Sequence, residues 1–135
     1  MKKYVFVAMF FFFYSVTSFG QVKKIKKVGN DKDSHGCIAS AGYTYSKIKK
    51  DCIRVFEQKI QLNEVSATKS YTSIVAVIFS EDKSSAELFI ADEKESVLLK
   101  RTGKKGNYIW KNTVYSLTAM DQYVLKKGTK IIYKS

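Results

Sequence analysis

The sequence predicts a mainly β protein, in which an antiparallel meander forms a small barrel or a sandwich and follows one disulfide-stapled segment near the N-terminus. Two observations carry this prediction. In the second half of the chain, short apolar runs recur about every 8 to 12 residues and are separated by polar or glycine-containing turns. In the first half, Cys37 and Cys52 are the only cysteines of a chain that begins like an exported protein.

The meander is expected to occupy residues 71–135. Its first strand, Tyr71–Ser80, is β-branched and too apolar for an exposed strand, so we expect it to lie at the centre of the sheet beside Ala86–Ala91. The remaining strands are predicted at Val97–Arg101, Tyr108–Lys111, Thr113–Ala119, Gln122–Lys126 and Lys130–Lys134. A meander of this length closes into a small barrel or folds into a sandwich.

Residues 1–20 have the layout of a secretory signal peptide. Two lysines supply a positive start, an apolar run containing Phe10–Phe13 follows, and small and polar residues precede an expected cleavage before Gln21. The apolar run is much shorter than the ~20 residues that a membrane-spanning helix needs, so no stable span is expected after cleavage. The mature chain, 21–135, should form a single β-rich domain that is periplasmic or secreted. Its first ten residues, Gln21–Asn30, fit either a short edge strand or a solvated arm.

The segment Asp31–Glu57 holds both cysteines and the only histidine. Two cysteines in an exported chain predict a disulfide, which would close a loop of 14 intervening residues and contribute about 3 kcal/mol to stability through chain entropy. Within this loop, Tyr43–Tyr45 has strand propensity, and Ser46 is placed to cap a short helical turn over Lys47–Cys52. The apolar residues of 53–56 lead into a further strand.

The mature chain carries a net charge of +10, from 22 basic against 12 acidic residues, and all but two of the basic residues are lysines. Lysine acts as a point charge, so such a surface attracts anions broadly. Aromatic and lysine residues also interleave near the C-terminus, which is typical of β-barrels that bind single strands or sugars. These residues are Lys104, Lys105, Tyr108, Trp110, Lys111, Tyr115, Tyr123, Lys126, Lys127, Lys130 and Tyr133. The alternatives are that Trp110 and Tyr115 belong to the core, and that the lysines reflect a general bias of composition.

No pattern of catalytic residues stands out. The chain has one histidine, its cysteines are expected to be oxidised, and neither a GxSxG elbow nor a phosphate-binding glycine loop is present. The carboxylates of Glu81–Asp82 and Asp92–Glu95 fall in predicted turns, where they lack the desolvation that catalytic pairs need. We therefore expect neither enzymatic activity nor a cofactor.

The run DKDSHG, residues 31–36, begins like a calcium-binding loop. It places Asp31, Asp33 and His35 close together, but the twelfth position is Gly42, where a bidentate glutamate is required. No metal is therefore expected. The two aspartates are predicted instead to bond to nearby backbone groups ahead of the disulfide.

The run from His35 to Glu57, HGCIASAGYTYSKIKKDCIRVFE, resembles a segment of a family of small exported bacterial proteins with no assigned activity. The matching positions are His35, Gly36, Cys37, Ser40–Tyr43, Cys52–Arg54, Phe56 and Glu57. The resemblance implies a disulfide-stapled structural unit more clearly than it implies a site.

The second half of the chain is similar in outline to the periplasmic C-type lysozyme inhibitors. Those are small exported antiparallel barrels with one disulfide and a serine–glycine loop that enters the lysozyme cleft. The corresponding loop here would be Ser40–Tyr43, which lies nearer the N-terminus than that family's loop. A net charge of +10 would also repel a basic lysozyme. Lysozyme inhibition is therefore an alternative function.

Together these features predict a monomeric, exported, non-catalytic binding or structural module of the bacterial envelope. Its partner would be an envelope or extracellular ligand, either a protein or an anionic glycan, and not nucleic acid. The predicted binding residues lie in the stapled segment and are His35, Ser40, Tyr43, Tyr45 and Arg54. For two of them the alternative is structural, with Arg54 paired to Glu57 and Tyr43 packed on the sheet.

Overall fold

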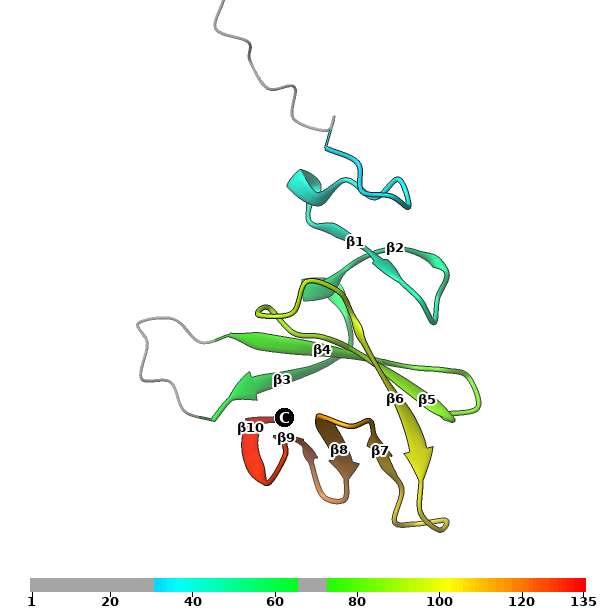
Figure 1. Ribbon diagram of the computed structural model, residues 1–135, viewed down its shortest axis with the longest axis vertical. Helices are drawn as coiled ribbons and strands as arrows, with labels where there is room; N and C mark the ends of the chain where they lie inside the picture. The colour runs from blue at the N-terminus through cyan, green and yellow to red at the C-terminus, as the bar shows by residue number, and fades with distance from the viewer. Residues whose placement is uncertain (1–30, 66–72) are drawn as a thin grey trace, which may run out of the picture.

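The computed structural model describes residues 31–65 and 73–135 (Figure 1). The predicted signal peptide, the segment Gln21–Asn30 and the start of the predicted strand Tyr71–Ser80 lie outside the described residues. Within them the chain is mainly β, as predicted, and its only helices are two 3-10 helices of three residues each. No helix in this part of the chain is long and apolar enough to cross a membrane.

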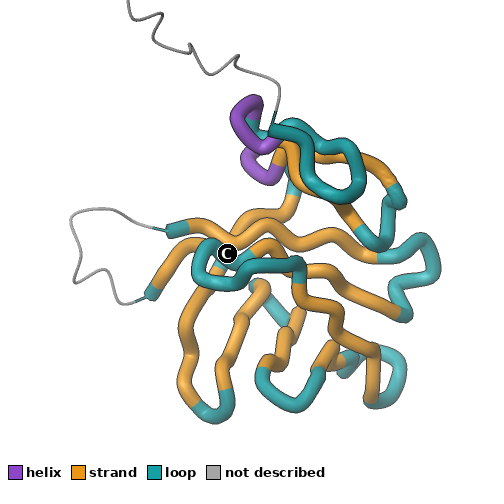
Figure 2. Tube along the Cα trace, turned by 45° about the horizontal axis from the view of Figure 1, so that its top comes forward, coloured by secondary structure: helices purple, strands orange, loops and turns teal. Residues whose placement is uncertain are grey.

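Eight antiparallel strands form a closed barrel in up-and-down order (Figures 1 and 2). They are β3 (Ile60–Glu64), β4 (Ile74–Phe79), β5 (Ser85–Phe89), β6 (Val97–Thr102), β7 (Ile109–Lys111), β8 (Tyr115–Ala119), β9 (Tyr123–Lys127) and β10 (Lys130–Lys134). Each strand pairs with the next along the chain, and β10 pairs with β3 to close the ring. The predicted antiparallel meander is confirmed, and of the two predicted forms it takes the barrel.

Alternate side chains along the strands fill the interior, as expected for a barrel of eight strands. The fully buried set includes one leucine from each of five strands, namely Leu62, Leu88, Leu99, Leu117 and Leu125. The prediction that Trp110 and Tyr115 are core residues is confirmed, since they are 4% and 5% exposed. The indole N–H of Trp110 is satisfied inside the fold, because it donates to the Lys83 carbonyl at 2.8 Å.

Residues 53–56 are expected to lead into a further strand, whose bounds the sequence does not set, and in the structure the next strand after them is β3. Its residues alternate as a half-buried strand should, with Leu62 fully buried between the polar residues Gln61 and Asn63. Two amide side chains in a run of five concealed this pattern. The strand matters for the fold because it pairs with β4 on one side and with β10 on the other.

A separate hairpin precedes the barrel. It consists of β1 (Tyr43–Ser46) and β2 (Asp51–Arg54), and it is flanked by the 3-10 helices η1 (Ala39–Ala41) and η2 (Val55–Glu57). The predicted disulfide joins Cys37 to Cys52 across Cα atoms 5.5 Å apart. It therefore staples the segment before β1 to the second strand of the hairpin.

The prediction of a helical turn over Lys47–Cys52 is wrong. A tight turn stands in its place, and Cys52 lies in β2. Ser46 does act as a cap would, since its hydroxyl accepts the Lys49 N–H at 3.0 Å and its carbonyl accepts the Lys50 N–H at 2.8 Å. Lys50 then adopts a φ of 55°, outside the helical region, and the chain returns as a strand. The residues after Cys52 are divided between β2 and η2 and do not form one strand.

The hairpin packs on the outer surface of the barrel, over β4 and β5 (Figure 1). Ile53 of β2 forms a second apolar cluster with Ala76, Ile78 and Phe89, which point away from the barrel interior. Both faces of β4 and β5 are therefore covered, which explains why Tyr71–Ser80 is apolar at successive positions. The two strands are predicted to be central in the sheet, but a closed ring has no central strand. They are instead distinguished by being buried on both faces.

The turn between β4 and β5 contains a carboxylate, that of Asp82, whose pKa is strongly lowered. The Ser84 N–H donates to Asp82 Oδ1 at 2.9 Å and the Ser80 hydroxyl donates to the same atom at 2.8 Å. These bonds lower the pKa of Asp82 from 3.8 to about 2. Because the folded-state pKa is depressed, ionised Asp82 favours the fold above its unfolded pKa, and this contribution is lost as pH falls toward 2.

We expect the carboxyl carbon of Asp82 to titrate with a midpoint of about 2 in a carbon-detected NMR experiment. Replacing Ser80 by alanine should raise that midpoint, since it removes one donor to the carboxylate. The substitution Glu81→Gln, in the same turn, should leave it in place. A midpoint at the ordinary value of 3.8 would show that the two bonds do not form in solution.

Candidate functional site

Four of the five predicted binding residues lie on one face of the hairpin. Tyr43 and Tyr45 alternate with residues that point at the barrel, so their rings lie on the opposite face. Arg54 is paired directly across from Tyr43, which puts its side chain on the same face. The His35 ring stacks on Tyr45 with centroids 3.8 Å apart and planes 7° apart. We call these four residues the hairpin face.

Arg54 is the centre of this face. Its guanidinium lies over the Tyr43 ring, 4.6 Å from the centroid, and 5.9 Å from the centroid of the exposed Phe56 ring. It also pairs with Glu57 at 3.0 Å, and this hydrogen bond raises the pKa of Arg54. The predicted ion pair with Glu57 is thus present. The Arg54 Nε is buried without a hydrogen-bond partner among the described residues.

Gly42, the residue before β1, has a backbone conformation and a close contact that both favour glycine. Its φ of 79° belongs to the left-handed region that favours glycine. A Cβ at this position would lie 3.1 Å from the Phe56 ring, so a side chain would also press on the ring beside Arg54. The hairpin face is therefore an ordered surface in which each predicted residue already contacts another. Whether it also binds a ligand stays a prediction.

Ser40, the fifth predicted residue, lies in η1 and is bonded to Asp31. The Ser40 hydroxyl and N–H donate to the two Asp31 carboxylate oxygens at 2.7 and 2.8 Å. Asp33 Oδ1 accepts the N–H groups of His35 and Cys37 at 2.8 and 2.9 Å. The prediction that the aspartates bond to nearby backbone groups ahead of the disulfide is confirmed for Asp33, whereas Asp31 bonds to Ser40, nine residues along the chain. Among the described residues, no group of three or more His, Cys, Asp or Glu is placed to hold a metal ion.

A buried carboxylate that the sequence reasoning missed joins the hairpin to the barrel. Glu87 lies on the outer face of β5 with no exposed surface. Its Oε2 accepts from the Ser46 hydroxyl at 2.7 Å and the Ile48 N–H at 3.1 Å. Its Oε1 accepts from the Ser96 hydroxyl at 2.6 Å and the Lys47 N–H at 2.8 Å. The one available signal was a single glutamate inside the apolar run AELFIA.

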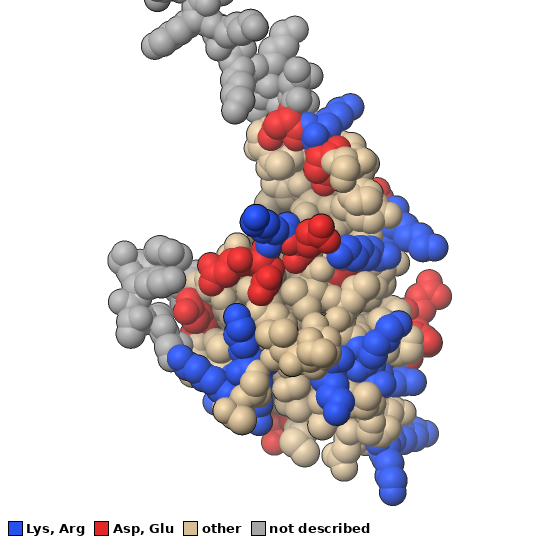
Figure 3. All heavy atoms as spheres, in the orientation of Figure 1, with Lys and Arg blue, Asp and Glu red and all other residues tan. Residues whose placement is uncertain are grey.

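Positive charge is concentrated on one side of the barrel. Residues 97–135, which form β6 to β10, hold nine basic residues and one acidic residue, a net charge of +8. The other described residues, 31–65 and 73–96, hold eight basic and eleven acidic residues, a net charge of −3. Figure 3 shows basic side chains gathered over the lower part of the molecule, while acidic ones gather nearer the hairpin. We call the outer surface of β6 to β10 the lysine-rich face.

The strand register aligns three lysines across the lysine-rich face. Lys100 of β6 is paired with Lys111 of β7, Lys111 with Ser116 of β8, and Ser116 with Lys126 of β9. With strands ~4.8 Å apart, this lysine row spans about 14 Å. Lys100 and Lys111 are directly opposed, and like charges in that position destabilise a sheet. The sequence of strands β6 to β10 contains no acidic residue to offset them.

Comparison with known proteins adds no relative. The chain matches no protein-family model, and searches of curated proteins and of solved structures find no similar protein.

Proposed function

We propose that this chain is an exported, non-catalytic binding module that holds a linear anionic polymer of the cell surface against its lysine-rich face. The observation that carries the proposal is the charge separation, +8 on residues 97–135 against −3 on the rest of the described chain. A general bias toward lysine would spread these residues over the whole surface and would not exclude acidic residues from five successive strands.

The lysine row favours a linear ligand with repeated charges. Its members face outward from β6, β7 and β9, so they present three charges in a line across the barrel wall, with Ser116 of β8 between Lys111 and Lys126. A bound polyanion neutralises the repulsion between Lys100 and Lys111 and releases its own condensed counterions. Lysine acts as a point charge and binds carboxylate, sulfate or phosphate groups alike. The charge density of the ligand therefore matters more than which of these groups it carries.

Location and disulfide support a partner at the cell surface. The signal-peptide pattern of residues 1–20 and the Cys37–Cys52 bond both fit an oxidising compartment outside the cytoplasm. Nucleic acid is scarce there, whereas anionic polysaccharides are abundant. Lysozyme inhibition is less well supported, because the Ser40 hydroxyl and N–H are both engaged by Asp31.

The proposal predicts that charge position, and not total charge, decides affinity. The triple variant Lys100→Gln, Lys111→Gln and Lys126→Gln should bind a fluorescent polygalacturonate oligomer at least about tenfold more weakly at low salt. The slope of log affinity against log salt should become shallower by about two, since up to three contacts are lost. Fluorescence anisotropy over a salt series measures both quantities.

The matched control changes the net charge by the same amount elsewhere. Lys32, Lys59 and Lys94 are exposed and lie outside the lysine-rich face, and their replacement by glutamine should leave affinity and salt slope close to the parent values. Equal weakening by the two triple variants would overturn the proposal, because binding would then follow net charge alone. Tighter binding of a single-stranded oligonucleotide of equal charge would overturn the assignment to cell-surface polymers.

A further inference from the structure

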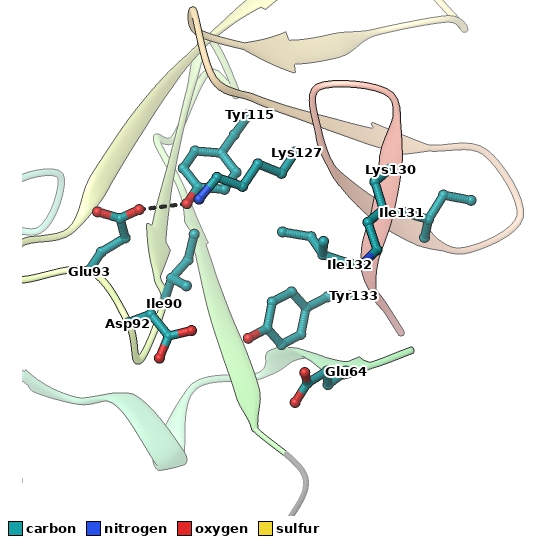
Figure 4. A pocket seen from close by; sticks show the side chains of 10 residues that line it. All are labelled: Glu64, Ile90, Asp92, Glu93, Tyr115, Lys127, Lys130, Ile131, Ile132 and Tyr133. Carbon is teal, nitrogen blue, oxygen red and sulfur yellow. Dashed lines mark hydrogen bonds between the residues drawn. The ribbon is translucent and has the colours of Figure 1, made fainter. Parts of the chain in front are cut away.

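A cavity of about 240 Å³ opens at one end of the barrel (Figure 4). It lies where β5 and β9 end and β8 and β10 begin. Its walls contain three carboxylates, two lysines, two tyrosines and three isoleucines. Barrel mouths are common sites for small ligands, and a cavity below ~300 Å³ suits one smaller than a drug molecule.

Two of the carboxylates and the two lysines come from separate parts of this mouth, while the third carboxylate, Glu64, ends β3. Asp92 and Glu93 belong to the turn between β5 and β6. Lys127 and Lys130 are paired across β9 and β10 and bracket the turn that joins them. In Figure 4 Glu93 and Lys127 approach the Tyr115 hydroxyl from different sides, and Asp92 lies across the cavity from Lys130.

These opposite charges share the cavity without pairing. Among the described residues the only ion pairs within 4.0 Å are Lys47–Glu95 and Arg54–Glu57, and neither involves the mouth. Oppositely charged groups that line one small cavity and do not touch leave both signs available to a ligand. A molecule that carries a cation and an anion a few bonds apart would contact both walls at once.

Hydrogen bonds from hydroxyl groups hold two of the carboxylates in position, one from Tyr115 to Glu93 and one from Ser73 to Glu64. The Tyr115 hydroxyl donates to Glu93 Oε1 at 2.5 Å, and burial together with this bond raises the pKa of Tyr115 to about 12. The Ser73 hydroxyl donates to Glu64 at 2.9 Å and lies 2.8 Å from the Tyr133 hydroxyl. Groups fixed before binding lose little freedom on contact with a ligand, which is the condition for useful affinity at a small site.

We propose that the barrel mouth binds a small zwitterion, with its ammonium toward Asp92 and Glu93 and its carboxylate toward Lys127 and Lys130. The chemical class is an amino acid or the end of a short peptide. The apolar lining, which includes Ile90 and Ile132, would meet the substituent of the α-carbon. This site is separate from the lysine row, because Lys100, Lys111 and Lys126 do not line the cavity.

The test uses the mature, oxidised chain with L-alanine, two blocked probes that each lack one of its charges, and a dipeptide. L-Alanine should shift the backbone amide signals of Asp92, Glu93, Lys127 and Lys130 in a ¹⁵N-correlated NMR titration. N-acetylalanine lacks the ammonium and alaninamide lacks the carboxylate, so each should bind at least about tenfold more weakly, as expected when one partner of a charge pair is removed. Alanylalanine distinguishes the two sources, since tighter binding than L-alanine would assign the site to peptide ends.

Variants at the mouth and matched controls elsewhere show where L-alanine binds. Asp92→Asn and Lys130→Gln should each weaken L-alanine binding about tenfold. The controls Asp121→Asn and Lys104→Gln, in turns at the other end of the barrel, should not change it. The proposal is overturned if about 50 mM L-alanine, which saturates a site of millimolar affinity, shifts no amide at the mouth. It is also overturned if the blocked probes bind as well as L-alanine. Polygalacturonate binding should be unchanged in Asp92→Asn, so the two proposals fail separately.

Discussion

Replacing Cys37 and Cys52 together by alanine is expected to lower the free energy of unfolding by about 3 kcal/mol. The bond closes a loop with a sequence separation of 15, and cutting it restores conformational freedom to the unfolded chain. Alanine is the appropriate replacement because Cys37 is 1% exposed, and a serine hydroxyl would be buried there. Urea denaturation of the parent and of the double variant measures the difference.

Removing the disulfide should loosen the segment around Cys37 in addition to lowering the stability of the whole fold. Cys37 belongs to a segment that also bonds within itself, through the Asp31–Ser40 hydrogen bonds and the bridge between Lys32 and Ile38. Hydrogen exchange should therefore accelerate first in residues 31–46, while amides of the barrel near Leu117 keep their protection. The single variant Ser34→Ala, in the same segment, is the control and should change stability little. A double variant as stable as the parent would show that hairpin packing alone fixes this segment.

The barrel could be predicted because its signals are local. Turns such as TGKKGN and KKGTK stand between short apolar runs, so the strands from β4 to β10 could be located within a few residues. The hairpin was harder, because Ser46 makes the local bonds of a helix cap and only the positive φ of Lys50 turns the chain back. The disulfide was predictable from the export signal and the cysteine count, which need no geometry.

The candidate sites depend on contacts between residues far apart in sequence. The excess of lysine is visible in composition, but the register that aligns Lys100 with Lys111 and Lys126 exists only once the strands pair. The mouth brings Glu64, Asp92 and Lys130 together from three different parts of the chain. A pattern along the sequence cannot predict either arrangement. The predicted residues of the stapled segment lie in one short stretch, which is why they could be grouped before the structure.

Glu87→Gln is expected to lower the free energy of unfolding by about 3 kcal/mol, although it preserves the shape of the side chain. Four donors face the carboxylate, two at each oxygen. An amide replaces one oxygen by an NH₂ group, which cannot accept from the backbone N–H of Lys47 or Ile48. One buried N–H is then left without an acceptor, and the remaining bonds lose the strength that a charged acceptor gives.

The matched control is Glu95→Gln, the same substitution on another partner of Lys47. Glu95 pairs with the Lys47 ammonium at 3.0 Å, but its side chain is 79% exposed, so the change should cost less than about 1 kcal/mol. Urea denaturation of both variants gives the comparison. If Glu87→Gln destabilises no more than Glu95→Gln, the carboxylate does not hold the hairpin on the barrel.

A double-mutant cycle with Ser46→Ala shows what the carboxylate joins. Ser46 and Glu87 are 41 residues apart in sequence, and the hydroxyl donates to Oε2 at 2.7 Å. Two residues that share one buried network should have a coupling energy of about 1 kcal/mol or more, whereas independent sites would simply add. Coupling combined with faster hydrogen exchange at Lys47 and Ile48 would mean that Glu87 ties the hairpin to β5. Additive effects would leave the apolar cluster around Ile53 as the main contact, and the hairpin could then open from the barrel without breaking a polar network.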